Sequence, residues 1–235
     1  MNSYRHAFYK SAQYLLSEAI PNKWMRDKIA TNIYTTLFSK GLPDQIYVNP
    51  REISLFTGRE NASQMVIKDM GVEKGGNWDH REIIKNKFPN RWNPSDSIYY
   101  NQSLFHTSLK RRYEENLEWE NTEYYKYAKE QTEYSPFWHG CASEECILKR
   151  CSEIDRLYYS IKEKGYISRL ELYNRGKTKD RTKIQALSNE IVIDIGRNGE
   201  PLFIDGKHRL SICKILRIKK VPVIPVVTHE QYSSD

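Results

Sequence analysis

A short run near the end of the chain, Asp205-Gly206-Lys207-His208-Arg209, combines the residue types that bind phosphate. The apolar residues before it predict a strand, and the residues after it predict a helix with three nitrogen-bearing side chains in its first turn. Helix starts attract anions through backbone N–H groups and the positive end of the helix dipole, and a glycine there lets a phosphate approach closely. The run therefore predicts an anion site, although salt bridges or capping contacts at a sheet edge would use the same residues.

The residues of this run are expected to have different roles. Lys207, His208, Arg209 and Ser211 would donate hydrogen bonds to phosphate oxygens, and the two basic side chains would add charge. A carboxylate repels phosphate, so Asp205 is expected to hold a magnesium ion with its waters or to accept a proton from a substrate hydroxyl. His208 is also a catalytic candidate.

A loop in the first half of the chain is a candidate for substrate binding. Trp78, Asp79 and Arg81 follow paired glycines, so an indole, a carboxylate and a guanidinium share one turn. Such a turn could bind a polar substrate or stack on a nucleobase. A surface turn anchored by a buried Trp78 is the alternative interpretation.

Glu52 is a third catalytic candidate. It follows a short predicted strand at 45–48 that is halted by Asn49-Pro50. It could act as a general base if that strand lies beside the phosphate site. A solvent-exposed glutamate without a catalytic role is the alternative.

The elements that would position these residues predict an α+β fold. A helix is expected over 144–164, because apolar residues repeat there at alternating spacings of four and three, Ser143 can cap its start and Gly165 can end it. We expect this helix to pack across a small mixed sheet. The predicted strands are 45–48, 190–195, 201–204 and 221–227, with a short helix at about 207–217.

The remaining segments predict additions to this core. Residues 1–43 are expected to form an N-terminal pair of helices with a break at Pro21. Residues 44–235 are expected to form the main domain. The polar and aromatic stretch from about 57 to 138 is too long for a connecting loop. It is expected to be an insertion with helices of its own.

The composition favours polyanionic partners. The chain has 235 residues, a formal net charge of +7 and a pI near 9.1, which suits nucleotides, nucleic acid or an anionic membrane surface. No apolar run approaches the roughly 20 residues that span a bilayer. The first twenty residues are also too polar and aromatic for a signal peptide, so a cytoplasmic location is expected.

The cysteines could be zinc ligands, but their spacing does not favour a zinc site. Cys141, Cys146 and Cys151 lie five residues apart beside His139. On a helix, five residues turn about 140° past a full circle, so neighbouring cysteines would face different directions. Reduced thiols without stoichiometric zinc are therefore expected.

The order of the predicted elements resembles the nucleotide-binding domain of the ParB/sulfiredoxin superfamily. The resemblance rests on the helix end Ser160–Gly165, the run Ile204–Leu216 and Val221-Pro222-Val223, and it covers about 144–228. A further match at 45–53 requires 57–138 to be an insertion. The family resemblance implies that the Gly-x-x-Arg segment binds nucleotide phosphates.

The resemblance implies a nucleotide-dependent phosphotransferase that uses ATP, ADP or CTP with Mg²⁺ and acts on a hydroxyl of a small molecule or polymer. The free-serine kinase branch is the most similar. Sulfiredoxins need a cysteine within the box, and 206–209 contain none. Partition ParB proteins continue into a helix-turn-helix domain, whereas about ten residues follow the last predicted strand. A nucleotide-switched DNA-binding protein and a nuclease are the alternatives, and the sequence leaves the oligomeric state open.

Overall fold

The computed structural model describes every residue except 1–10, 13, 17, 39–40, 86–96, 135–140 and 233–235. The described chain is α+β, with helices packed around a six-stranded mixed sheet. None of its helices is long and apolar enough to cross a membrane. The start of the first predicted helix, before residue 11, lies outside the described residues. The described residues among 11–19 are helical, and the helix is interrupted at 20–22, as expected for a break at Pro21.

The sheet contains the four predicted strands, which are confirmed, and two short additional strands. Its strand order is β1-β6-β4-β5-β2, with β3 pairing the end of β6. The strand β6 runs parallel to β4 and antiparallel to β1, and β4 and β5 form an antiparallel pair. The bounds are β1 Ile46–Val48, β2 Leu55–Phe56, β3 Val72–Lys74, β4 Val192–Ile195, β5 Pro201–Asp205 and β6 Val221–His229.

The central position of β4 follows from its composition. All four of its residues are buried, including Asp194. A strand covered on both faces reads as a continuous apolar run instead of an alternating one. The turn that joins it to β5 contains Gly199, whose φ of 80° favours glycine.

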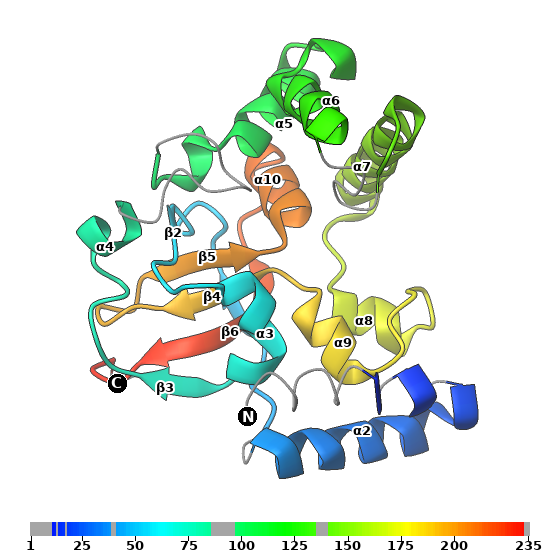
Figure 1. Ribbon diagram of the computed structural model, residues 1–235, viewed down its shortest axis with the longest axis vertical. Helices are drawn as coiled ribbons and strands as arrows, with labels where there is room; N and C mark the ends of the chain where they lie inside the picture. Colours follow the sequence, from blue (N-terminus) through cyan, green and yellow to red (C-terminus); the bar gives the residue numbers. More distant parts are fainter. Residues whose placement is uncertain are drawn as a thin grey trace.

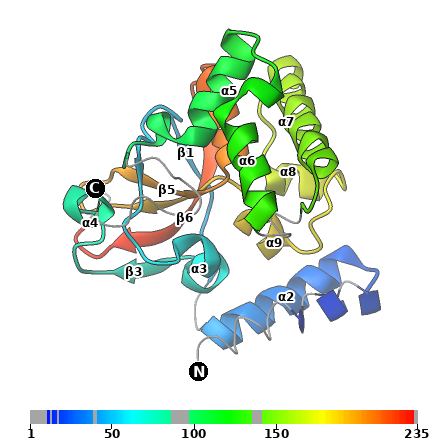
Figure 2. The same ribbon diagram turned by 45° about the horizontal axis from the view of Figure 1, so that its top comes forward.

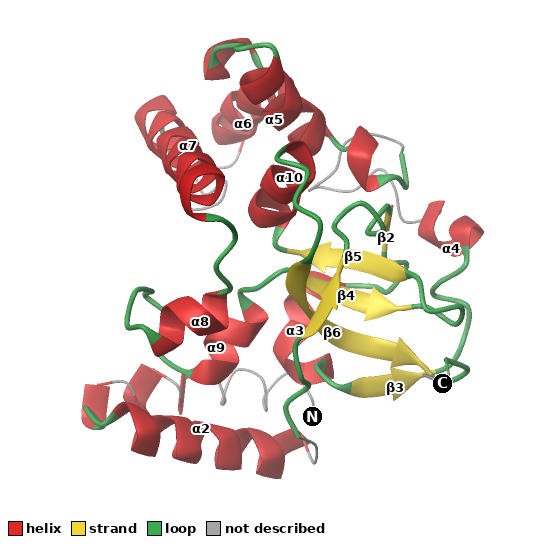
Figure 3. Cartoon of the chain, turned by 180° about the vertical axis from the view of Figure 1, so that it is seen from behind, coloured by secondary structure: helices red, strands yellow, loops and turns green. Residues whose placement is uncertain are grey.

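Four helices lie on one side of the molecule, around and below the sheet in Figure 1. They are α2 (Lys23–Phe38), α3 (Ala62–Asp69), α8 (Arg169–Asn174) and α9 (Lys183–Ser188). The helix α3 packs on β5 and β6, and Figure 3 shows the strands in front of it. Asp27 of α2 accepts hydrogen bonds from Tyr173 Oη and from the Lys183 backbone N–H, both at 2.8–2.9 Å. These two bonds dock α2 on α8 and α9.

A second group of helices forms a layer beyond α10 (Figures 1 and 2). The layer consists of α5 (Leu104–Glu114), α6 (Glu123–Tyr134) and α7 (Glu144–Lys164), with short 3-10 helices at Tyr100–Gln102 and Trp119–Asn121, whereas α10 is the helix Lys207–Ile215. The predicted bounds of α7 are confirmed, because Ser143 caps its start and Gly165 ends it.

The expected packing of α7 across the sheet is wrong. Its apolar stripe, which includes Ile147, Ile154 and Ile161, packs on α5, α6 and α10. The aromatic residues Phe105 and Tyr124 supply the surface that covers this stripe. The helix α10 lies between this layer and the sheet, so it takes the position that was expected for α7 (Figure 1).

The segment 57–138 contributes more than helices. Besides α5 and α6 it contains α3, the short helix α4 (Arg81–Lys85) and the strand β3, which joins the main sheet beside β6. A three-residue strand is too short to show alternation in the sequence. For this reason the pattern did not reveal that part of this segment belongs to the sheet.

Two of the four cysteines differ from the expectation of buried or reduced thiols. Cys141 and Cys146 form a disulfide, with Cα atoms 5.3 Å apart, while Cys151 and Cys213 are free and buried. The spacing argument assumed one continuous helix. Since α7 begins at Glu144, Cys141 lies outside the helix, and the chain can bend it toward Cys146.

A buried ion network ties the start of α3 to the centre of the sheet. Arg59 donates two hydrogen bonds to Asp194, from Nε at 2.7 Å and from Nη2 at 3.0 Å, and one to Asp69 at 2.6 Å. The side chains of Arg59 and Asp194 are 6% and 0% exposed. Asp194 also accepts from Thr57 Oγ1 and from the Val227 backbone N–H, so this carboxylate is fully coordinated.

We expect Arg59→Ala to lower the free energy of unfolding by about 3–5 kcal/mol, because it leaves a buried carboxylate without its main partner. Arg111→Ala is the matched control, since Arg111 pairs with Glu115 on an exposed helix face and should cost less than about 0.5 kcal/mol. Urea unfolding of the three proteins measures both values. Equal losses in the two variants would contradict the structural role of the network.

Candidate functional site

The predicted strand, glycine and helix around 205–209 are present. The strand β5 ends at Asp205, and Gly206 is the residue before α10 with a φ of 90°. A Cβ atom on Gly206 would lie 2.8 Å from Glu190 O and 2.8 Å from Ile191 Cα. A glycine is therefore required here because the turn packs directly against the backbone of Glu190 and Ile191. The sequence had suggested a different reason, the close approach of a phosphate.

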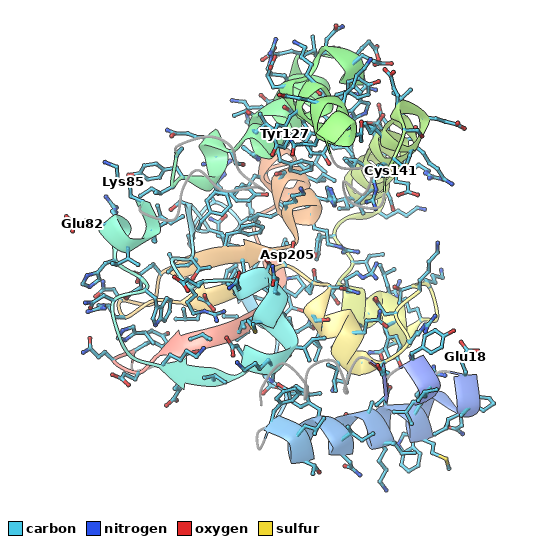
Figure 4. All side chains as sticks on the ribbon, in the orientation of Figure 1. Glu18, Glu82, Lys85, Tyr127, Cys141 and Asp205 are labelled. Atoms are coloured by element: carbon cyan, nitrogen blue, oxygen red, sulfur yellow. A yellow bond between two sulfur atoms is a disulfide. The ribbon has the colours of Figure 1, made fainter. Side chains whose placement is uncertain are left out.

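Asp205 is exposed at the end of β5, beside α3 (Figure 4). Its Oδ1 accepts the Gly206 backbone N–H at 2.7 Å. This bond fixes one carboxylate oxygen at the turn. The side chain also forms part of the wall of a cavity, so it can meet a bound molecule.

Lys207 and His208 extend toward the helical layer. The Lys207 Nζ lies 5.0 Å from the centroid of the Phe105 ring and 5.6 Å from that of Tyr124. The His208 ring meets Phe105 edge-on, with centroids 4.9 Å apart. The pKa of Lys207 is lowered to about 8, mainly by burial and also by the charge of Arg150, against the opposing effect of Asp205. An ammonium and an imidazole thus face aromatic rings at the start of α10.

Arg209 is 8% exposed and is directed toward the loop after α7. Its Nη1 donates to Ile167 O at 3.3 Å and to Tyr166 Oη at 3.5 Å. Its Nε and Nη2 make no hydrogen bond with the residues that the structure describes. Arginine carries five N–H donors in a planar fork, so the guanidinium is held in place on one side and retains donors on the other.

Glu190 organises this corner of the molecule, and sequence reasoning treated it only as the start of a strand. Its carboxylate is 1% exposed and accepts from the Arg169 backbone N–H at 2.6 Å and the Ile191 backbone N–H at 2.9 Å. Tyr166 Oη also donates to it. A buried acid therefore holds the start of α8 next to the turn at Gly206.

Ser211 does not belong to the phosphate site. It is 0% exposed, and its hydroxyl lies 2.8 Å from Tyr100 Oη. Because Tyr100 donates its proton to Lys207 O at 2.9 Å, the serine must donate to the tyrosine oxygen. Ser211 thus anchors α10 to the segment before α5, one helical turn away from the helix start.

Glu52 lies away from this site. It is exposed in the turn after β1, and its backbone N–H donates to Asn49 O. The neighbouring Arg51 is close enough to Lys214 to contribute to the lowering of the Lys214 pKa to about 8, burial being the larger cause. Lys214 is near the end of α10, about 10 Å along the helix from its start. The condition for a catalytic Glu52, proximity to the phosphate site, is not met.

The loop with Trp78, Asp79 and Arg81 lies at the other end of the sheet. Asp79 accepts three hydrogen bonds from Arg197, which lies in the turn between β4 and β5. Figure 4 shows the labelled residues of α4 well separated from Asp205. Trp78 and Asp79 are buried and Arg81 is exposed, so the loop fits the alternative of an anchored turn.

Asp79 should control part of the acid stability of the protein. Burial raises its pKa, but hydrogen bonds from Arg197 outweigh this effect and lower the pKa to about 2 from 3.8. A carboxyl with a depressed folded-state pKa stabilises the protein above its unfolded value, and this contribution disappears as the pH falls from about 4 to about 2. The amount is about 2 kcal/mol.

Asp79→Asn should accordingly reduce the change in unfolding free energy between pH 5 and pH 2 by about that amount. Arg197→Ala removes the cause of the shift and should reduce the same change. Urea unfolding at a series of pH values measures the slope. An unchanged slope in Asp79→Asn would refute the assignment.

A polar cavity of about 590 Å³ adjoins the end of β5. Of the run 205–209, only Asp205 lines it. The other walls come from α3, α9, the N-terminal helical segment and the loop 175–182 before α9, which is rich in lysine and arginine and is called the basic loop. The lining residues are Tyr14, Ser63, Gln64, Val66, Ile67, Lys179, Arg181, Gln185, Ser188, Asn189 and Asp205. The volume is in the range of cavities that hold small metabolites or nucleotides.

Metal binding at Asp205 would have to rely on one carboxylate. The described residues contain no group of three or more His, Cys, Asp or Glu that could hold a metal ion. Magnesium in phosphoryl-transfer sites is often bound by one or two carboxylates together with waters and substrate phosphates. The exposed side chain of Asp205 fits that limited role, and it does not fit a metal held by the protein alone.

Comparison with known proteins gives no family: no protein-family model matches the chain, and no match was found among curated proteins or solved structures. The function must therefore be inferred from the contacts, burial and charges of the residues described above.

Proposed function

We propose that the protein is a nucleotide-dependent phosphotransferase of the ParB/sulfiredoxin-like type, with nucleotide phosphates at the first turn of α10. The observation that carries this proposal is the juxtaposition of one exposed carboxylate, Asp205, with three basic side chains at a single helix start. Phosphoryl transfer needs cationic groups around the phosphates and a separate group for the attacking hydroxyl. The turn offers both.

The basic side chains of the turn differ in how well they are placed to bind phosphate. Arg209 is held by Tyr166 and Ile167 O, so it loses little freedom when its remaining donors bind phosphate oxygens. Lys207 and His208 lie against Phe105, and a phosphate that reached them would meet a partly dehydrated positive charge. Charges in such surroundings interact more strongly than charges in water.

Asp205 would receive the proton of the acceptor hydroxyl. The hydroxyl oxygen forms a bond to the terminal phosphorus while the bond from that phosphorus to the rest of the nucleotide breaks, so the nucleotide leaves with one phosphate fewer. Magnesium, when bound, would neutralise charge on the phosphates. Oδ1 is engaged by Gly206, which leaves Oδ2 for the proton.

Asp205→Asn should retain nucleotide binding and lose turnover, because an amide keeps the shape of the side chain and cannot accept the proton. Thermal shift with ATP, ADP, CTP and GTP in the presence of magnesium measures binding, since a ligand of the folded state raises the melting temperature. Nucleotide consumption with hydroxyl substrates measures turnover. Asp44→Asn, an exposed change before β1, is the matched control. Full turnover in Asp205→Asn would remove the catalytic assignment.

Arg209→Ala should weaken nucleotide binding by about tenfold to more than a hundredfold, the usual cost of a lost charge-assisted pair. It also removes a partner of Tyr166, so its unfolding free energy must be measured beside its affinity. Arg209→Lys keeps the charge without the fork and should be intermediate. A folded Arg209→Ala protein with wild-type affinity would show that the phosphates bind elsewhere.

The two alternative functions predict other results. A nucleotide-switched DNA-binding protein would bind duplex DNA with an affinity that depends on CTP or ATP. A nuclease would cleave nucleic acid without nucleotide. Either result, together with no nucleotide consumption in the presence of hydroxyl substrates, would favour that alternative over phosphoryl transfer.

A further inference from the structure

The cavity between α3 and α9 adjoins the phosphate turn but does not cover it. Only Asp205 belongs to both. We propose that this cavity is the acceptor subsite and takes a small hydroxylated molecule that carries an anionic group, a carboxylate or a phosphate. This inference rests on the proposed phosphotransferase function, and it assigns the class of acceptor.

Two cationic side chains of the basic loop indicate that the ligand of this cavity carries an anionic group. Lys179 and Arg181 line the cavity, and neither pairs with a carboxylate among the residues that the structure describes. The nearest acid in sequence, Asp180, is already engaged by Arg169 at 2.6 Å and by Asn189 at 2.8 Å. The cavity wall therefore carries two positive charges against the single negative charge of Asp205.

Arg181 is held in a defined position. Its backbone N–H donates to Gln185 Oε1 at 2.8 Å, and its guanidinium carbon lies 4.5 Å from the centroid of the Tyr14 ring. Stacking on an aromatic ring orients the planar fork while leaving its edge for hydrogen bonds. A carboxylate or phosphate could bind that edge with two parallel bonds.

The other walls suit hydroxyl groups. Ser63 and Gln64 are exposed at the start of α3, and Asn189 donates to Asp180 through Nδ2, which leaves its carbonyl oxygen as an acceptor. Val66 and Ile67 supply a short apolar floor. An acceptor anchored by its anionic end at Arg181 would present a hydroxyl toward Asp205, which is the group assigned to take its proton.

The N-terminal helical segment becomes part of the site in this arrangement. Tyr14 contributes to the cavity wall, and α2 is fixed on α8 and α9 by Asp27. The sequence suggested a helical pair at the N-terminus that packs on the main domain, without a role in a binding site. Its position against Arg181 instead makes it a wall of the acceptor subsite.

Isothermal titration with four probes tests this inference in the absence of nucleotide: inorganic phosphate, glycerol 3-phosphate, glycerate and glycerol. The anionic probes with hydroxyl groups should bind at least about tenfold more tightly than neutral glycerol. Preference for glycerol 3-phosphate or for glycerate distinguishes a phosphate from a carboxylate. Arg181→Ala should weaken binding of the preferred probe by about ten- to a hundredfold.

Arg175→Ala is the matched control, because Arg175 lies in the same basic loop, pairs with Glu171 and does not line the cavity. It should bind the probes like the wild type. Anionic probes that bind no better than glycerol, or equal losses in Arg181→Ala and Arg175→Ala, would overturn the inference. Tighter binding of adenosine than of any anion would also overturn it, since the cavity would then hold a nucleobase.

Nucleotide binding by thermal shift separates the two proposals. If nucleotides bind and the anionic probes do not, the acceptor subsite is refuted and the phosphotransferase proposal stands. If the probes bind through Arg181 and no nucleotide binds, the cavity is an anion site and the phosphotransferase proposal fails. Unfolding curves for Arg181→Ala confirm that any lost binding is not lost folding.

Discussion

The close approach of the Gly206 turn to the backbone of Glu190 and Ile191 fixes the position of the candidate site. A side chain at Gly206 would collide with that backbone, so the turn and the start of β4 must stay in contact. The side chain of Glu190 holds the start of α8, because its carboxylate accepts the Arg169 backbone N–H. One glycine and one buried acid therefore connect β5, α10, α8 and the beginning of β4.

The position of α10 decides which way the basic side chains extend. It lies between the sheet and the layer of α5, α6 and α7, so Lys207 and His208 meet Phe105 while Arg209 meets the loop after α7. Partial burial among the rings strengthens the electrostatic interactions of Lys207 but disfavours its charged form. An anionic ligand at the helix start would offset that cost.

Charge is distributed unevenly between the two ends of the sheet. At one end Asp79 and Arg197 neutralise each other, and in the centre Arg59 neutralises Asp194. At the other end Lys179 and Arg181 have no such partner within the described part of the chain. Paired charges stabilise the fold, whereas uncompensated charges beside a cavity are suited to binding.

The local elements and the strand-glycine-helix turn could be predicted from the sequence, because these depend on periodicity and on residues near in the chain. The bounds of α7 and the four main strands followed from apolar spacing. What each face contacts could not be predicted from the sequence: α7 packs on helices, Ser211 bonds Tyr100, and Cys141 forms a disulfide with Cys146. Periodicity identifies an apolar face but not the element that covers it, and the cavity beside Asp205 is built from segments far apart in the chain.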